Sequence, residues 1–223
     1  MIKTTFIFLA SLLFFHYSFS QSNKDKAEKM LAYTDSINNE ILGEGEYHNY
    51  YLIHEVKLES NRRAIGKQYT NIKFYYRQFK DKPVESGGST DFADIKEPPI
   101  KVTVEYNISA SVKYLYEYYF NRQSELMYVS SLEITDSCRK EYLFYEKGKL
   151  FYCKKCILTS CNLKNNPTDK NETEENTFLM TDVKDISKDF SADQLKVAKK
   201  KLANAQQYLT MFDQLLLIEK TDK

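Results

Sequence analysis

The sequence has almost no net charge, and this absence bears on its partners. The 223 residues include 32 Lys and Arg against 31 Asp and Glu, and without the first twenty residues both counts are 31. Proteins that bind nucleic acid or an anionic membrane surface present an excess of basic residues. A chain whose charges cancel lacks that excess, so we expect neither nucleic acid nor an anionic membrane among its partners.

Long apolar runs are also missing, with one short exception at the N-terminus. Residues 6–15 are nearly all apolar and follow Lys3, but they fall short of the roughly twenty residues that a transmembrane helix needs. The tripeptide Ser18-Phe19-Ser20 then places small residues at the two positions that signal peptidase recognises. This layout predicts a signal peptide over residues 1–20, cleaved near Ser20-Gln21, rather than an uncleaved anchor. The mature protein is then periplasmic or secreted, with no transmembrane segment.

Catalytic motifs are absent as well. Beyond the leader the only histidines are His48 and His54, and there is no Gly-x-Ser-x-Gly sequence, so a nucleophilic triad is not expected. The two histidines are six residues apart with no carboxylate pattern to complete a site, which argues against metal binding. Carboxylate pairs for glycoside hydrolysis stay open, because the chain has 31 acidic residues. We predict no catalytic, cofactor-binding or metal-ligating residue, and no cofactor.

Tyrosine, by contrast, is abundant, and the 18 tyrosines suit a partly buried β-sheet. Between residues 101 and 120 the even-numbered positions are apolar or aromatic, while most odd-numbered positions are polar. A period of two indicates a strand with one buried face and one solvated face. Shorter patterns predict further strands over residues 47–60, 68–78 and 177–183.

The central stretch also contains a repeat with an offset of 24 residues. Glu117-Tyr118-Tyr119-Phe120 precedes Leu126, and Glu141-Tyr142-Leu143-Phe144 precedes Leu150 at the same distance. Each unit predicts a hairpin, and the two together predict a meander. In the second unit, Glu146-Lys147-Gly148 predicts a three-residue loop with Gly in the left-handed conformation.

The same loop sets a register in which Cys138 lies opposite Cys156. Four cysteines in an exported chain suggest disulfides, and this register favours Cys138–Cys156, which leaves Cys153–Cys161. Two alternatives stay open. Cys153-Lys154-Lys155-Cys156 has the CxxC spacing of thiol oxidoreductases, although no βαβ pattern surrounds it. The four thiolates could instead hold a structural zinc ion, for which their spacing is irregular.

Two helices are expected, one at each end of the mature chain. Residues 25–42 carry apolar side chains at helical spacing, and residues 192–219 repeat them at alternating steps of three and four. Ser191 and Gln194 form a capping box before the second helix. Its apolar stripe could be a coiled-coil seam, but an apolar sheet face also needs covering, which favours packing within the chain.

These elements predict one α+β domain over residues 21–223. We expect an antiparallel meander of six to seven strands with the N-terminal helix and the long C-terminal helix packed on one face. Residues 81–99, with several Gly and Pro, and the polar residues 162–176 are expected to be loops.

The hairpin phrase Glu-Tyr-x-Phe followed by Leu-x-Tyr resembles one in uncharacterised exported proteins of Bacteroidota, as does the leader ending in Ser-Gln. The resemblance implies an envelope location and an α+β fold, and it implies no activity. The favoured function is a non-enzymatic binding protein of the periplasm or cell envelope, with a protein, peptide or glycan ligand on the polar sheet face or the 81–99 loop. A secreted hydrolase with a carboxylate pair and a scaffold that oligomerises through the C-terminal helix are the alternatives.

Overall fold

The computed structural model describes residues 22–42, 51–63, 66–80, 94–109, 112–135, 138–158 and 180–221. The predicted signal peptide and the predicted loop over residues 162–176 lie outside the described residues, as do Cys161, His48 and residues 81–93 of the other predicted loop.

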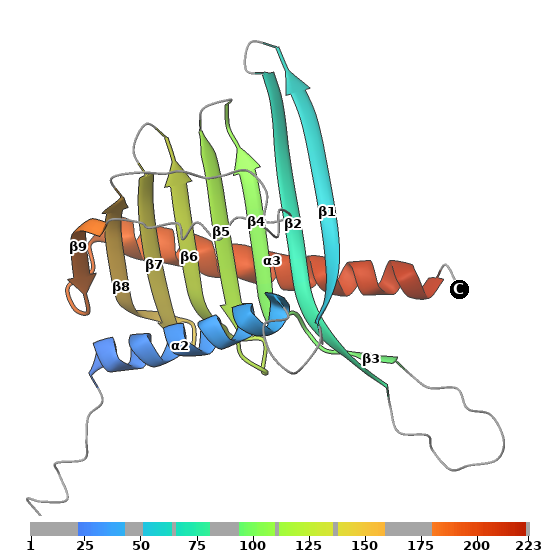
Figure 1. Cartoon of the computed structure of the whole chain (residues 1–223), viewed down its shortest axis with the longest axis horizontal. Coiled ribbons are helices and arrows are strands. Elements are labelled where there is room, and N and C mark those ends of the chain that lie inside the picture. Colours follow the sequence, from blue (N-terminus) through green and yellow to red (C-terminus); the bar gives the residue numbers. More distant parts are fainter. Residues whose placement is uncertain are drawn as a thin grey trace, which may run out of the picture.

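The described part of the chain contains one sheet of nine antiparallel strands (Figure 1). Eight strands lie in the order β1-β2-β4-β5-β6-β7-β8-β9, and β3 pairs with β2. The strands are β1 (Tyr51–Arg62), β2 (Gly66–Lys80), β3 (Asp94–Lys96), β4 (Lys101–Asn107), β5 (Lys113–Phe120), β6 (Leu126–Ile134), β7 (Cys138–Glu146), β8 (Lys149–Leu158) and β9 (Met180–Ile186). The helices are α2 (Asn23–Leu42) and α3 (Ala192–Thr221). The predicted α+β meander is confirmed, with more strands than the six to seven expected.

The two helices lie on opposite faces of the sheet, which corrects the prediction that both pack on one face (Figure 1). Along β5, Tyr118 and Phe120 pack with α3, while Tyr119 between them packs with α2. Consecutive residues of a strand point to opposite faces, so three aromatic residues in a row make both faces apolar. Each apolar face needs a covering layer, and the chain supplies one helix for each.

The alternating stretch over residues 101–120 is two strands rather than one. β4 and β5 form a hairpin, with Tyr106 opposite Tyr114 and Val102 opposite Tyr118. Partners in this register have the same parity, so the even-numbered residues of both strands face α3. The alternation therefore continues across the turn, and the pattern alone does not show where the first strand ends.

Both units of the repeat are hairpins, as predicted, and each contains a β-bulge. β5 pairs with β6 and β7 pairs with β8, and the two registers skip Met127 and Phe151. These residues occupy the same position in the repeat, and both side chains pack against the cluster beneath α2. The repeat in the sequence thus corresponds to a repeated backbone irregularity.

The turn between β7 and β8 has two residues, where three were predicted. Lys147 and Gly148 have positive φ angles of 50° and 73°, as a type I′ turn requires. Together with the bulge at Phe151, this turn displaces the register from the predicted one. Cys138 consequently pairs with Leu158, and the predicted juxtaposition of Cys138 with Cys156 is wrong.

α3 begins with the predicted capping box and packs on the sheet through its apolar stripe. The N–H of Ser191 donates to Gln194 Oε1 at 2.8 Å, and the N–H of Gln194 donates to Ser191 Oγ at 3.2 Å. The buried residues of the stripe include Ala198, Ala205, Leu209 and Phe212. The stripe that could have formed a coiled-coil seam is thus buried within the same chain.

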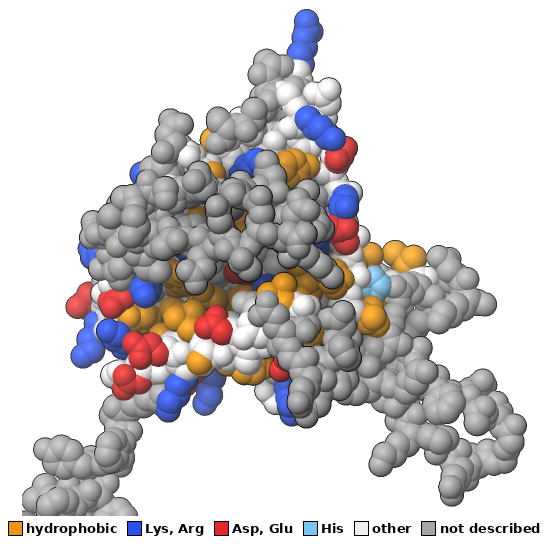
Figure 2. Space-filling model, in the orientation of Figure 1, with side chains coloured by type: hydrophobic (Ala, Val, Ile, Leu, Met, Phe, Trp, Pro, Cys, Tyr) orange, Lys and Arg blue, Asp and Glu red, His pale blue; other side chains and the backbone are white. Residues whose placement is uncertain are grey.

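α2 covers the other face, and a charged group is buried beneath it. Lys101 is 8% exposed, its Nζ lies 2.8 Å from Glu117 Oε1, and it donates to Asn38 Oδ1 at 2.6 Å. The hydroxyl of Tyr119 donates to the same Asn38 oxygen at 2.9 Å. Because a buried charge must be paired and hydrogen-bonded, this cluster holds α2 in place. On the outer surface around α2, basic and acidic side chains are mixed (Figure 2).

Candidate functional site

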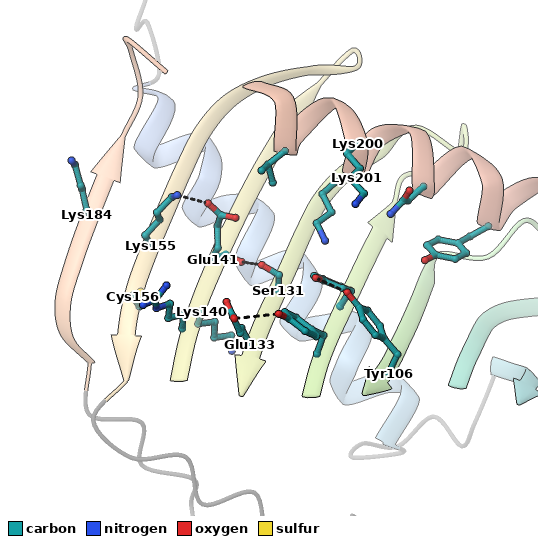
Figure 3. Close-up of a pocket in the computed structure, with 16 residues that line it drawn as sticks. Tyr106, Ser131, Glu133, Lys140, Glu141, Lys155, Cys156, Lys184, Lys200 and Lys201 are labelled. Carbon is teal, nitrogen blue, oxygen red and sulfur yellow. Dashed lines mark hydrogen bonds and ion pairs between the residues drawn. The ribbon is translucent and has the colours of Figure 1, made fainter. Parts of the chain in front are cut away.

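A pocket of about 850 Å³ lies between the sheet and the N-terminal half of α3 (Figure 3). Strands β4 to β9 supply its floor, and α3 supplies its roof. The lining residues are Tyr106, Tyr114, Tyr116, Ser131, Glu133, Arg139, Lys140, Glu141, Lys155, Cys156, Lys184, Val197, Lys200, Lys201, Asn204 and Tyr208. A concave site of this size is typical of small-molecule binding, and here four tyrosines stand beside ten polar or charged residues.

Three tyrosines of the β4–β5 hairpin form one wall of the pocket. Their rings stack with centroids 5.1 Å apart for Tyr106 and Tyr114 and 6.2 Å apart for Tyr114 and Tyr116. The Tyr114 hydroxyl donates to Glu133 Oε1 at 3.2 Å, and the Tyr106 and Tyr116 hydroxyls lie 3.3 Å apart. Burial raises the pKa of Tyr114 and of Tyr116, so both hydroxyls stay neutral and can donate hydrogen bonds.

Lys201 reaches into the pocket from α3 and lies against this wall. Its side chain is buried, with 9% of the residue exposed, and Nζ lies 3.1 Å from the centre of the Tyr116 ring. No hydrogen bond or ion pair joins Nζ to any residue that the structure describes, whereas the buried Lys101 has both. Desolvation lowers the pKa of Lys201 to about 8, and the negative charge of Glu141 opposes this shift only in part.

Basic residues outnumber acidic residues in the lining of the pocket. Five basic side chains face the pocket, Arg139, Lys155, Lys184, Lys200 and Lys201, against two acidic ones, Glu133 and Glu141. The sixth basic residue of the lining, Lys140, has its Nζ over the Tyr142 ring on the other face of the sheet. Glu141 Oε1 is 2.9 Å from Lys155 Nζ, and Glu133 accepts the hydrogen bond of Tyr114. Both carboxylates therefore have partners among the lining residues, and the pocket retains an excess of positive charge. Its chemistry suits a negatively charged ligand with an apolar or aromatic body.

The predicted disulfide pairs do not form. Cys153 and Cys156 are both free and buried, so neither Cys138–Cys156 nor Cys153–Cys161 is present. Cys138 is disulfide-bonded, but not to either of these two. The displaced register of the β7–β8 hairpin is the physical reason, because it separates Cys138 from Cys156 along the strands.

The CxxC spacing has no redox role in this geometry. Cys153 and Cys156 are three residues apart on β8, and they belong to clusters on opposite faces of the sheet. Burial raises the pKa of the Cys153 thiol to about 12, which keeps it in the unreactive protonated form. Among the described residues, no group of three His, Cys, Asp or Glu side chains could hold a metal ion.

His54, the described member of the histidine pair, lies in the aromatic core at the other end of α3. Its ring stacks on Tyr76 with centroids 5.0 Å apart and meets the edge of Phe212, and its Nε2 is 2.7 Å from the Tyr76 hydroxyl. These contacts give His54 a packing role.

Sequence reasoning did not identify the pocket or Lys201. Lys201 is the last of three consecutive lysines, Lys199, Lys200 and Lys201, and a run of lysines on a helix normally indicates a solvated face. The one usable signal was its place in the helix, three residues after Ala198 and next to Leu202, on the side that faces the sheet.

The chain matches no protein-family model, no curated protein and no solved structure. None of the helices that the structure describes is long and apolar enough to cross a membrane. What the fold and site define is an α+β protein whose antiparallel sheet and C-terminal helix enclose a tyrosine-walled, basic pocket.

Proposed function

We propose that this is an exported, non-enzymatic binding protein that holds a small organic anion in the pocket between α3 and the sheet. The ligand carries an acidic group, such as a carboxylate, sulfonate or phosphate, on an aromatic or apolar body. The acidic group lies beside Lys201, and the body lies along the tyrosine wall.

The observation that carries this proposal is the buried, unsatisfied charge of Lys201. A pKa lowered from 10.5 to about 8 means that the folded protein holds this ammonium group at a cost of about 3 kcal/mol. Proteins normally pair a buried charge, as this chain does for Lys101. An anion in the pocket would remove most of that cost, and this gain would appear as affinity, up to about a hundredfold.

The neighbouring groups extend the same recognition. Lys200 also points into the pocket from α3, and Ser131 lies on the sheet below it (Figure 3). Asn204 and Ser131 add uncharged polar groups to the lining. The stacked rings of the β4–β5 hairpin provide a flat apolar surface on which an aromatic body can stack. The excess of positive charge favours an anion, and the stacked rings favour an aromatic or apolar body. Together they favour a ligand that has both features.

A hydrolase remains the second candidate, because Glu133 and Glu141 both line the pocket from adjacent strands. Hydrolysis of glycosides needs one carboxyl group that gives a proton and a second that stays ionised. Here Glu141 is held by Lys155 and Glu133 by Tyr114, which favours binding over catalysis. The scaffold alternative has less support, since the stripe of α3 is buried on the sheet.

Two fluorescent probes that differ by one charge test the proposal. Anilinonaphthalene sulfonate and uncharged phenylnaphthylamine share the same ring system, and the chain has no Trp to interfere with their fluorescence. We expect the mature protein to bind the sulfonate more tightly than the neutral probe. Lys201→Met should weaken sulfonate binding by about fiftyfold and leave the neutral probe unchanged, because only the charged contact is lost.

Lys199→Met is the matched control, because Lys199 is exposed on the same helix and does not line the pocket. It removes one positive charge from the protein and should leave both affinities unchanged. Equal losses of sulfonate binding in the two variants would mean that net charge attracts the probe, and the proposal would then fail. Hydrolysis of aryl glycosides that is abolished by Glu141→Gln would instead support the second candidate.

A further inference from the structure

We infer that the amine of Lys201 is also a nucleophile, which captures an aldehyde inside the pocket as a reversible imine. The ligand class is an aromatic or unsaturated aldehyde that fits against the tyrosine wall. This inference rests on the proposed function in one respect only, namely that the pocket admits an organic molecule.

The geometry separates Lys201 from the other amines of the pocket. Lys155 is ion-paired with Glu141 and its side chain is 47% exposed, and Lys184 and Lys200 are exposed residues. Lys140 has its Nζ over the Tyr142 ring, on the other face of the sheet. The Lys201 side chain is buried yet its amine opens into the pocket, without a hydrogen bond to the described residues that would occupy its lone pair. A ligand in the pocket can therefore reach this nitrogen, which extends from α3 toward the sheet (Figure 3).

The protonation state supports the same role. An imine forms from the neutral amine, so the fraction of neutral amine limits the rate. With a pKa of about 8, about one tenth of Lys201 is neutral at pH 7, whereas an ordinary lysine is neutral in about one molecule of three thousand. Desolvation by burial is the cause, and it is the condition under which lysines act as nucleophiles in other proteins.

The step is balanced without a further reagent. The neutral Nζ attacks the carbonyl carbon, and the carbonyl oxygen takes up a proton to give a carbinolamine. Loss of this hydroxyl as water leaves a C=N bond to Nζ, so one aldehyde and one amine yield one imine and one water. Nothing is oxidised or reduced.

The pocket also suits the product. A protonated imine carries its positive charge on Nζ and the adjacent carbon, close to where the ammonium charge was. The face of the Tyr116 ring, 3.1 Å from Nζ, attracts that charge, and Glu141 acts on the same nitrogen. A flat aryl imine can in addition stack on the wall formed by Tyr106 and Tyr114.

Reductive trapping tests the inference. The mature protein is treated with benzaldehyde and cyanoborohydride at pH 7, and modified lysines are located and timed by peptide mass spectrometry. We expect Lys201 to be labelled at least about tenfold faster than any other lysine, with a rate that rises with pH and levels off above about pH 8. Labelling of Lys201 at the same rate as the exposed lysines would overturn the inference.

Two variants complete the experiment. Lys199→Met should keep the fast labelling, and Lys201→Arg should lose it while keeping a positive charge in the pocket. Fast labelling that survives in Lys201→Arg would place the reactive amine elsewhere and reject the inference. Because benzaldehyde has no charge, fast labelling together with absent sulfonate binding would reject the proposed function alone. Sulfonate binding without fast labelling would reject the imine alone.

Discussion

Two lysines are buried on opposite faces of this sheet, and their surroundings differ. Lys101, beneath α2, is 8% exposed and has a carboxylate at 2.8 Å and an amide oxygen at 2.6 Å. Lys201, on the side of α3 that faces the sheet, is 9% exposed; its Nζ lies over the face of Tyr116 and has no hydrogen bond or ion pair with a described residue. Both residues are lysines with nearly equal exposed fractions, so neither the residue type nor the degree of burial distinguishes the two sites.

The two faces of the sheet therefore differ in how a buried charge is stabilised. On the α2 face, the charge of Lys101 is matched within the protein by Glu117 and Asn38. The α3 face is packed along the apolar stripe of the helix, from Ala198 to Phe212, and beside that stripe it encloses a pocket around Lys201. A buried charge that no described residue matches is a feature of ligand-binding sites, and it motivates the proposed function.

The strongest way to break this comparison is to unpair Lys101. Glu117→Gln leaves Lys101 buried without its carboxylate, and we expect the free energy of unfolding to fall by about 3 kcal/mol, measured by urea denaturation. The double variant Lys101→Met with Glu117→Leu should recover most of the loss, because no charge is then buried. A loss below about 1 kcal/mol in Glu117→Gln would show that the pair has no structural role.

The second prediction removes the unmatched charge. Lys201→Met should raise the free energy of unfolding by about 2 kcal/mol at pH 7, because Met has a similar length and needs no counter-charge. The gain is smaller than the cost of burying the ammonium, since the contact with the Tyr116 ring is lost too. Urea denaturation checks this, and a destabilised Lys201→Met would mean that the charge is satisfied in the folded protein.

The difference in stability between Lys201→Met and the parent protein should depend on pH. Between pH 8 and 10.5 the unfolded chain keeps the proton of Lys201 and the folded protein does not, so the stability of the parent protein rises with pH. The advantage of Lys201→Met is therefore complete below about pH 8 and disappears towards pH 10.5. A difference that stays constant over this window would assign the gain to packing instead.

The smallest predicted changes in stability come from removing the hydroxyl groups of Tyr119 and Tyr116. Tyr119→Phe removes the hydrogen bond to Asn38 on the α2 face, and we expect a loss of about 1 kcal/mol. Tyr116→Phe keeps the ring beneath Lys201 and removes only a long 3.3 Å contact, so its cost should stay below about 0.5 kcal/mol. Thermal unfolding of the two variants measures the contrast, and equal costs would contradict it.

Much of the fold follows from local patterns in the sequence. The period-two alternation and the repeated phrase predict the antiparallel meander, and the capping box predicts the start of α3 within one residue. These features depend on neighbouring residues, whose influence on the backbone is direct. The placement of α2 on its own face was also present in the runs Tyr118-Tyr119-Phe120 and Leu143-Phe144-Tyr145, which are apolar on both parities.

The errors have a different origin. The disulfide prediction depended on a register carried outward from one turn, so a two-residue turn and one bulge were enough to defeat it. The pocket depended on which charges find partners after folding, and that depends on contacts between residues far apart in the chain. Lys199, Lys200 and Lys201 are chemically identical in the sequence, and only the path of α3 across the sheet distinguishes the third.

The two skipped residues, Met127 and Phe151, have a consequence for the architecture as a whole. A sheet with strict alternation is a two-layer structure, with one helix layer and one solvated surface. Each skipped residue adds a side chain to the α2 cluster at the end of a hairpin, next to Tyr128 and Tyr152. The two bulges thus enlarge the apolar layer beneath α2 in a three-layer sandwich of helix, sheet and helix.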